Sequence, residues 1–222
     1  MATLLTIPAK PLVAPASWGS RASIKKMLEQ IKTDYDTYLT FSSEQSGIPK
    51  EVIASFIAVE SGGKASAGTS GHVTQGLMQW NRTYAKSNLE KEKSEGRLTA
   101  DEEAKLKEYG ITFDSNGKTR DITNADQLKP ELNILIGSII LGQKIDTDWG
   151  TEDGEMKLDR VIAVYNAGAY GTTGKLARSK KYKTPQALAS VVNSITAGYI
   201  KKMLGQDGAL DIAYTDKIFS AV

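Results

Sequence analysis

Glu60 is the residue whose type and position most directly suggest chemistry. It lies seven residues after Ile53, on the apolar side of a helix that we expect to begin at Pro49 and to end at Gly62 and Gly63. Burial and the negative end of the helix dipole both disfavour the charged carboxylate, so both should raise its pKa. A carboxylic acid that stays protonated near neutral pH can donate a proton to a leaving oxygen. The alternative is a structural glutamate, bonded to a neighbouring backbone group or to an arginine.

Two further segments place polar groups where chemistry could use them. The sequence GLMQ at 76–79 follows a polar, glycine-rich loop, and VYNAG at 164–168 closes a predicted helix. Within the second segment, Tyr165 occupies an apolar stripe while it carries a polar hydroxyl. Taken separately, the two segments are also compatible with an ordinary helix start and an ordinary helix cap. Their order and combination with Glu60 therefore carry more weight than either segment alone.

Composition excludes several kinds of site. The chain has 222 residues and no cysteine, which rules out disulfides, cysteine-bound zinc and thiol nucleophiles. His72 is the single histidine, so a histidine-rich metal site cannot form, and a Ser-His-Asp triad would depend on that one ring. The net charge of +2 is too small to predict nucleic-acid binding. We therefore expect no metal, no cofactor and no nucleic-acid partner.

The elements that must position these groups are almost all helical. Apolar residues recur at helical spacing in several segments, and 40% of the chain is hydrophobic, as in ordinary globular domains. Convincing strands are few, so we predict a mainly α fold. The segment 130–145 is the most apolar, and we expect it to be the central buried helix. The predicted helices cover about residues 24–39, 49–61, 130–145, 155–167 and 185–205.

The segment 86–113 differs in composition from the rest of the chain. Its residues 86–109 contain six Lys/Arg and seven Asp/Glu, and Thr99 with Glu102 indicates a capping box at the start of a short helix. The few apolar residues there should bury little surface. We expect an exposed helical hairpin, which acts either as a lid or docking element or as a plain solvated hairpin.

Together and in this order, the three motifs resemble those of the soluble lytic transglycosylase family, which has a goose-type-lysozyme-like fold. Two helices add to the resemblance, the central helix of that family and its closing helix. The resemblance covers about residues 45–205. The matching segments are Glu60-Ser61, GLMQ at 76–79, the central helix at 133–145, YNAG at 165–168 and the closing helix at 199–202.

The resemblance implies a lysozyme-like single catalytic domain at 20–205 that carries the charged helical insertion at 86–113. An extended N-terminal arm would precede it at 1–19, where three prolines disfavour a helix, and a C-terminal tail would follow at 206–222. The chain departs from the family in two places. The loop at 71–75 reads GHVTQ instead of a loop rich in glycine and alanine, and the charged insertion is absent from compact members.

The activity that the resemblance implies is that of a peptidoglycan lytic transglycosylase. Such an enzyme cleaves the β-1,4 bond between N-acetylmuramic acid and N-acetylglucosamine and forms a 1,6-anhydromuramic product, with Glu60 as the single general acid and base. One alternative is a muramidase, which hydrolyses the same bond on the same scaffold. Such a hydrolase ordinarily requires a second carboxylate, and no helix spacing in the sequence places one opposite Glu60. A third alternative is a virion or structural protein that binds glycan without cleaving it.

The resemblance also implies roles for five other residues. Ser70 would contact the acetamido region of the substrate. Met78 and Gln79 would line the saccharide cleft. Tyr165 would orient the acetamido group or the catalytic carboxyl, and Asn166 would hold the backbone of the cleft.

The sequence patterns and the resemblance together suggest where the protein acts. The most apolar stretch, 132–145, has 14 residues, fewer than the roughly 20 of a membrane span. Residues 1–17 lack a basic start and contain prolines, so we expect no signal peptide. We expect a monomer that binds peptidoglycan glycan strands and acts on the bacterial cell wall, in the periplasm. A phage lysis protein, a virion component or a specially exported protein would fit.

Overall fold

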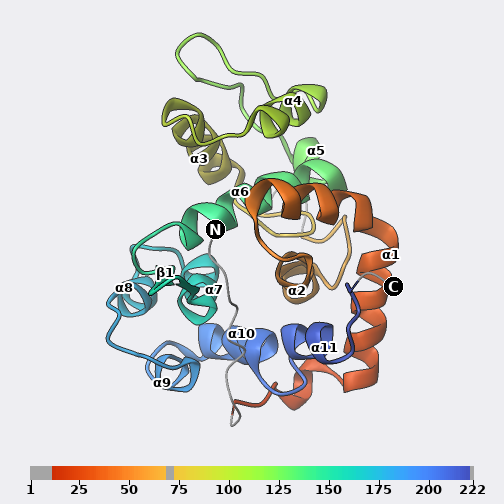
Figure 1. The fold of residues 1–222 in the computed structure, drawn as a ribbon, viewed down its shortest axis with the longest axis vertical. Coiled ribbons are helices and arrows are strands. Elements are labelled where there is room, and N and C mark those ends of the chain that lie inside the picture. The colour runs from red at the N-terminus through yellow and green to blue at the C-terminus, as the bar shows by residue number, and fades with distance from the viewer. Residues whose placement is uncertain (1–11, 69–72, 221–222) are drawn as a thin grey trace.

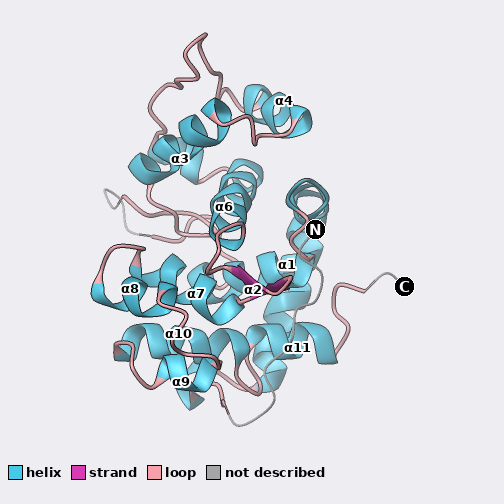
Figure 2. Ribbon diagram, turned by 60° about the vertical axis from the view of Figure 1, so that its left-hand side comes forward, coloured by secondary structure: helices cyan, strands magenta, loops and turns pink. Residues whose placement is uncertain are grey.

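The computed structural model of the protein describes residues 12–68 and 73–220. This part of the chain is mainly α, as predicted, with eleven α-helices, one 3₁₀ turn and one two-stranded hairpin (Figure 1, Figure 2). None of these helices is long and apolar enough to cross a membrane. The elements are η1 (Ala16–Trp18), α1 (Arg21–Ser46), α2 (Lys50–Ser61), α3 (Arg82–Ser94), α4 (Ala100–Glu108), α5 (Asn124–Gln127), α6 (Pro130–Ile145), β1 (Thr151–Glu152), β2 (Glu155–Met156), α7 (Leu158–Ala167), α8 (Thr172–Arg178), α9 (Pro185–Ala189), α10 (Ser194–Leu204) and α11 (Ala209–Thr215).

Helix α6 is the central buried helix, as its apolar sequence predicts. Pro130 occupies its first turn, where the missing backbone N–H costs nothing. Helices α1, α3, α5 and α7 all pack against it, so most of its surface is covered. Asn133, in the first turn of α6, is completely buried and therefore needs hydrogen-bond partners inside the protein.

Helix α2, which carries Glu60, is equally well enclosed. The seven residues at 52–58 are all buried, because α1, α10 and α11 pack around the helix. Pro49 is the N-cap rather than the first helical residue, one position from the prediction. Gly62 ends the helix in the left-handed conformation (φ 63°), which glycine adopts without a steric penalty. This ending fixes Glu60 in the last turn.

The packed domain continues beyond residue 205, so the prediction of a tail at 206–222 needs correction. Helix α11 lies in this segment, and its apolar side packs on α1, α2 and α10. The N-terminal segment also joins the domain, because the buried Leu12 accepts a backbone hydrogen bond from Gln206 (2.7 Å). Arg21, at the start of α1, pairs with Asp207 and Asp216 on either side of α11.

Two other predicted helices are shorter than expected. The segment 185–205 forms two helices, α9 and α10, because the Asn193 side chain caps α10 by accepting a hydrogen bond from the Thr196 backbone N–H (2.9 Å). Ile195, which lies inside the single helix predicted at 185–205, is 75% exposed. The segment predicted as a helix from 155 begins with the hairpin of β1 and β2, and α7 starts only at Leu158.

The charged segment forms the hairpin of α3 and α4, which projects from the body of the molecule (Figure 1, Figure 2). The predicted capping box is present: Thr99 Oγ1 accepts from the Glu102 N–H (3.0 Å), and the Glu102 carboxylate accepts from the Thr99 N–H (2.8 Å). The prediction that this segment buries little is wrong, because Leu89 and Leu106 are fully buried. Helix α3 also starts earlier than expected and packs on α6.

Candidate functional site

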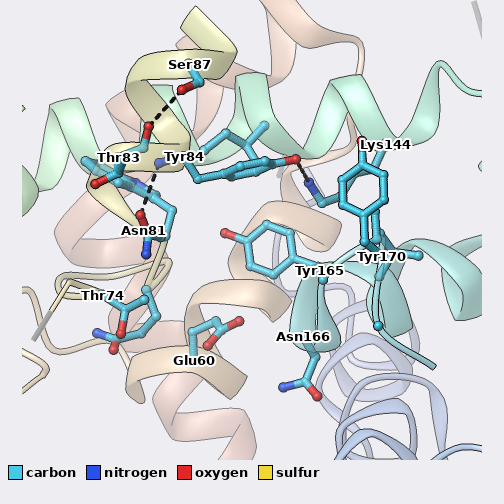
Figure 3. A pocket seen from close by; sticks show the side chains of 17 residues that line it. Glu60, Thr74, Asn81, Thr83, Tyr84, Ser87, Lys144, Tyr165, Asn166 and Tyr170 are labelled. Carbon is cyan, nitrogen blue, oxygen red and sulfur yellow. Dashed lines mark hydrogen bonds between the residues drawn. The ribbon is translucent and has the colours of Figure 1, made fainter. Parts of the chain in front are cut away.

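A pocket of about 860 Å³ lies where the end of α2 meets the start of α3, the C-terminal half of α6 and the end of α7. Figure 3 shows side chains from all four helices turned toward it. Its lining residues come from segments that are far apart in the sequence. They are Glu60, Thr74, Gln79, Trp80, Asn81, Thr83, Tyr84, Ser87, Ile140, Lys144, Val164, Tyr165, Asn166, Gly168, Ala169, Tyr170 and Gly171.

Glu60 lines this pocket from the last turn of α2 and is partly buried. Burial raises the pKa of Glu60 to about 7, against an ordinary value of 4.5. The buried Tyr199 hydroxyl lies near the carboxyl and favours its ionised form. It therefore offsets part of the rise in the pKa of Glu60 that burial causes. Among the described residues no Lys, Arg or His lies within ion-pair distance of Glu60, so the alternative of a glutamate neutralised by an arginine finds no support there.

Tyr165 stands beside Glu60 and is held in place at both ends of its side chain. Its ring packs on the Phe56 ring, with a centroid distance of 4.9 Å, and its hydroxyl donates to the Met78 carbonyl oxygen (2.8 Å). Burial and the nearby Glu60 carboxyl raise the pKa of Tyr165 well above its ordinary value, so its hydroxyl stays neutral. Tyr165 therefore links α7 to the GLMQ segment.

The GLMQ segment, whose Gln79 lines the pocket, is held in place through its backbone. The Asn133 side chain accepts from the Met78 N–H (2.8 Å) and donates to the carbonyl oxygens of Gln127 (2.7 Å) and Gln75 (3.2 Å). Gly76 has φ 84°, and a side chain there would collide with Asn133 and with the Gln127 carbonyl group. Only glycine fits this turn, because the segment lies directly against Asn133.

The side chains of the GLMQ segment differ from the prediction in one case. Gln79 lines the pocket, and its Nε2 donates to the carbonyl oxygens of Ala67 (3.0 Å) and Gly76 (2.7 Å). Met78 is fully buried and does not line the pocket, because its side chain fills the space above Gly137 of α6. Its contribution is the carbonyl oxygen that accepts from the Tyr165 hydroxyl, so the prediction of a cleft-lining Met78 side chain is corrected.

Asn166 and Ser70 complete the predicted set. Asn166 lines the pocket at the end of α7, and its Oδ1 accepts from the Thr196 hydroxyl (2.9 Å) on α10. Ser70 lies outside the described residues, as does His72.

Sequence reasoning did not place Tyr84, Lys144 or Tyr199 in the site. Lys144 lines the pocket at the far side of Tyr165 from Glu60 (Figure 3) and is only 7% exposed. Its Nζ donates to the Tyr84 hydroxyl (3.3 Å). A lysine inside an otherwise apolar helix, and tyrosines on apolar stripes, were the signals available in the sequence.

Among the described residues that line the pocket, Glu60 is the single carboxylate. Two aspartates that could serve a hydrolytic mechanism lie elsewhere. Asp126 pairs with Arg120 and caps α5, and Asp148 pairs with Lys180 (3.0 Å). In the described part of the chain, the pocket can therefore perform acid–base chemistry with one carboxyl group but presents no second carboxylate opposite it.

A comparison of the sequence with models of known protein families gave no match, and a comparison with curated proteins gave no significant match. The functional interpretation therefore rests on the geometry of the pocket and on the motifs that form it.

Proposed function

We propose that the protein is a peptidoglycan lytic transglycosylase on a lysozyme-like fold, with Glu60 as its single general acid and base. The observation that carries the proposal is a carboxyl group whose pKa is raised to about 7 in a pocket that holds no other carboxylate among its described lining residues. A carboxyl group with such a pKa exists in both protonation states near neutral pH, which a group acting first as acid and then as base requires.

In the first step, the protonated Glu60 carboxyl donates its proton to the glycosidic oxygen between N-acetylmuramic acid and N-acetylglucosamine. The bond from C1 of the muramic residue to that oxygen breaks, and the N-acetylglucosamine side leaves as an alcohol. The acetamido carbonyl of the muramic residue stabilises the positive charge that develops at C1, as in substrate-assisted glycosidases. The protein needs no second carboxylate for this step.

In the second step, the Glu60 carboxylate removes the proton from the C6 hydroxyl of the same muramic residue. The C6 oxygen then bonds to C1 and closes the 1,6-anhydro ring, and Glu60 regains its proton. No water is consumed, so the product is lighter than the hydrolytic product by one water molecule.

The surroundings of Glu60 suit both steps. Burial keeps the proton on the carboxyl until the leaving oxygen arrives, and Tyr165, packed on Phe56, lies beside Glu60 in the pocket. The neutral hydroxyls of Tyr165 and Tyr199 approach the site without adding charge. The partner in this proposal is a glycan strand of the bacterial cell wall, reached in the periplasm by a monomer.

Digestion of purified peptidoglycan tests the proposal. The unaltered chain should release muropeptides with 1,6-anhydro ends, which mass spectrometry identifies, and Glu60→Gln should release almost none. Reducing ends would instead identify a muramidase. Binding to peptidoglycan without any release would identify a glycan-binding protein without activity.

A further inference from the structure

The pocket has a second buried ionisable group, Lys144, which the proposed reaction does not use. Lys144 lies in the last turn of α6 with 7% of its surface exposed, and its side chain lines the pocket. Figure 3 shows its amino group beside the Tyr84 hydroxyl, with Tyr165 between it and Glu60. Lys144 therefore faces the same ligand as Glu60, from the opposite end.

The described part of the protein gives the Lys144 ammonium no carboxylate partner. No Asp or Glu there lies within 4.0 Å of its Nζ, and the Tyr84 hydroxyl (3.3 Å) is the one hydrogen-bond acceptor that it meets. The rings of Tyr84 and Tyr165 lie 5.0 and 5.7 Å from Nζ and add a weaker attraction. An ammonium group carries three donors, so this environment leaves it with unused capacity toward the pocket.

A second cation near this end of the pocket is also without a carboxylate partner in the described part of the chain. The Arg178 guanidinium lies over the Tyr170 ring, 5.6 Å from its centroid, and makes no ion pair there. By contrast, Lys180 and Lys183, which follow Arg178 in the sequence, are paired with Asp148 and Glu152. Two cations without a carboxylate partner in the described part of the chain, Lys144 and Arg178, thus lie against the pocket-lining tyrosines Tyr84 and Tyr170.

We propose that Lys144, with the Tyr84 hydroxyl beside it, forms a subsite for a carboxylate group of the ligand. The inference rests on the proposed function, because it assigns the ligand to the glycan strand that Glu60 cleaves. Muramic acid carries a lactyl carboxyl group at C3, either free or joined to a stem peptide that has carboxylates of its own. N-acetylglucosamine carries none, so the subsite distinguishes the two sugars of the strand.

The physical argument is the cost of a buried charge. Burial lowers the pKa of the Lys144 ammonium below its ordinary value, because the charged form is deprived of water. A carboxylate that enters the pocket would supply the missing partner, and a charge-assisted hydrogen bond formed away from water is stronger than one at the surface. The pocket thus presents a donor, held by the Tyr84 hydroxyl, to a carboxylate of the ligand.

The test is a set of binding measurements in the Glu60→Gln background, where bound glycan is not cleaved. Three soluble probes are titrated: a neutral chitooligosaccharide, a peptide-free muramyl oligosaccharide with free lactyl carboxylates, and the same oligosaccharide with its stem peptides. Lys144→Met should weaken binding of a carboxylate-bearing probe about 10- to 100-fold and leave the neutral probe within about threefold. Loss confined to the peptide-free probe assigns the lactyl carboxylate, and loss confined to the peptide-bearing probe assigns a stem-peptide carboxylate.

Lys181→Met is the matched control. Lys181 is exposed and lies over the Tyr182 ring (5.7 Å), outside the pocket, so its loss removes a lysine–tyrosine contact without touching the subsite. A ligand-side measurement needs no variant at position 144: methyl esters of the muramyl probes should bind the Glu60→Gln chain more weakly than the free acids. This keeps the test valid if Lys144→Met fails to fold.

Two results overturn the inference and are distinguishable from each other. If free acids, esters and the chitooligosaccharide bind alike, and Lys144→Met changes none of them, the protein binds glycan but has no carboxylate subsite. If no probe binds the Glu60→Gln chain at all, the proposed function itself fails, and the subsite falls with it.

Discussion

Each end of the pocket has an ionisable residue in the last turn of a helix, an acid at one end and a base at the other. Glu60 lies in the last turn of α2, and Lys144 lies in the last turn of α6. Both line the pocket, and Tyr165 stands between them (Figure 3). Burial disfavours the charged form of each, so it raises the pKa of Glu60 and lowers the pKa of Lys144.

The helix dipole affects Glu60 and Lys144 in opposite ways. The C-terminal end of a helix dipole is negative, so it disfavours a carboxylate and favours an ammonium ion. At Glu60 the dipole acts with burial, and the neutral acid is preferred up to about pH 7. At Lys144 the dipole opposes burial and supports the charged form. One fold therefore obtains a proton donor at one end of a pocket and a cation at the other.

The largest expected effect is that of Glu60→Gln on turnover. Gln has nearly the same shape but cannot exchange the proton, and general acid–base catalysis contributes about 10²–10⁴-fold. The rate of muropeptide release should fall by about that factor. Glu51→Gln, in the first turn of the same helix, removes a carboxylate at the end where the dipole favours it and should leave the rate unchanged. If Glu60→Gln released muropeptides as fast as Glu51→Gln and the unaltered chain, Glu60 would not be the catalytic residue.

The position of the GLMQ segment depends on Asn133. Asn133→Ala leaves the Met78 N–H and the Gln127 carbonyl without the partner that they have now, in a fully buried place. The free energy of unfolding should fall by about 2–4 kcal/mol, measured by chemical denaturation. Asn116→Ala, on an exposed turn that follows α4, should cost less than about 0.5 kcal/mol. A similar small cost at Asn133 would mean that other contacts hold the GLMQ segment.

The contrast between the two ends also predicts a pH dependence of stability. Folding favours the protonated form of Glu60, so its contribution is fully present below about pH 4.5 and is lost as the pH rises through about 7. Relative to Glu60→Gln, the unaltered chain should lose about 1–3 kcal/mol of unfolding free energy between pH 4.5 and 8. Denaturation curves of both chains at each pH measure this. A constant difference would show that the carboxyl titrates normally.

The smallest expected effect is that of Tyr165→Phe. The ring stays packed on Phe56, and only the hydroxyl bond to the Met78 carbonyl is lost, at a cost of about 0.5–1.5 kcal/mol. Turnover should fall, because the link between α7 and the GLMQ segment loosens. Tyr35→Phe is the matched control, because it removes a similar bond, to the Gly63 carbonyl (3.1 Å), outside the pocket. If both variants release muropeptides at the rate of the unaltered chain, the Tyr165 hydroxyl contributes only to stability.

The sequence predicts what depends on local patterns. The apolar run at 130–145, the Thr99–Glu102 capping box and the position of Glu60 at a glycine-terminated helix end are all present in the structure. Each follows from residues within a few positions of one another. The general mainly α fold follows from the same kind of evidence.

The features that the sequence did not predict depend on contacts between distant segments. Helix α11 is short, and its place in the core is decided by packing on α1 and α2. Apolar periodicity showed that one face of a helix is buried, but not that Tyr199 would meet Glu60 or that Lys144 would meet Tyr84. Met78 was assigned to the cleft although its side chain fills the space above Gly137.

The most direct test of the central claim is to follow oxygen from the solvent into the product. Peptidoglycan is digested in water enriched in heavy oxygen, the products are reduced at once, and their masses are measured beside those of Glu60→Gln. A single carboxyl group that closes the C6 oxygen onto C1 predicts anhydro ends without any heavy oxygen, and almost no product from Glu60→Gln. Reducing ends that carry heavy oxygen would show that water attacks C1, and would contradict the account of Glu60 given above.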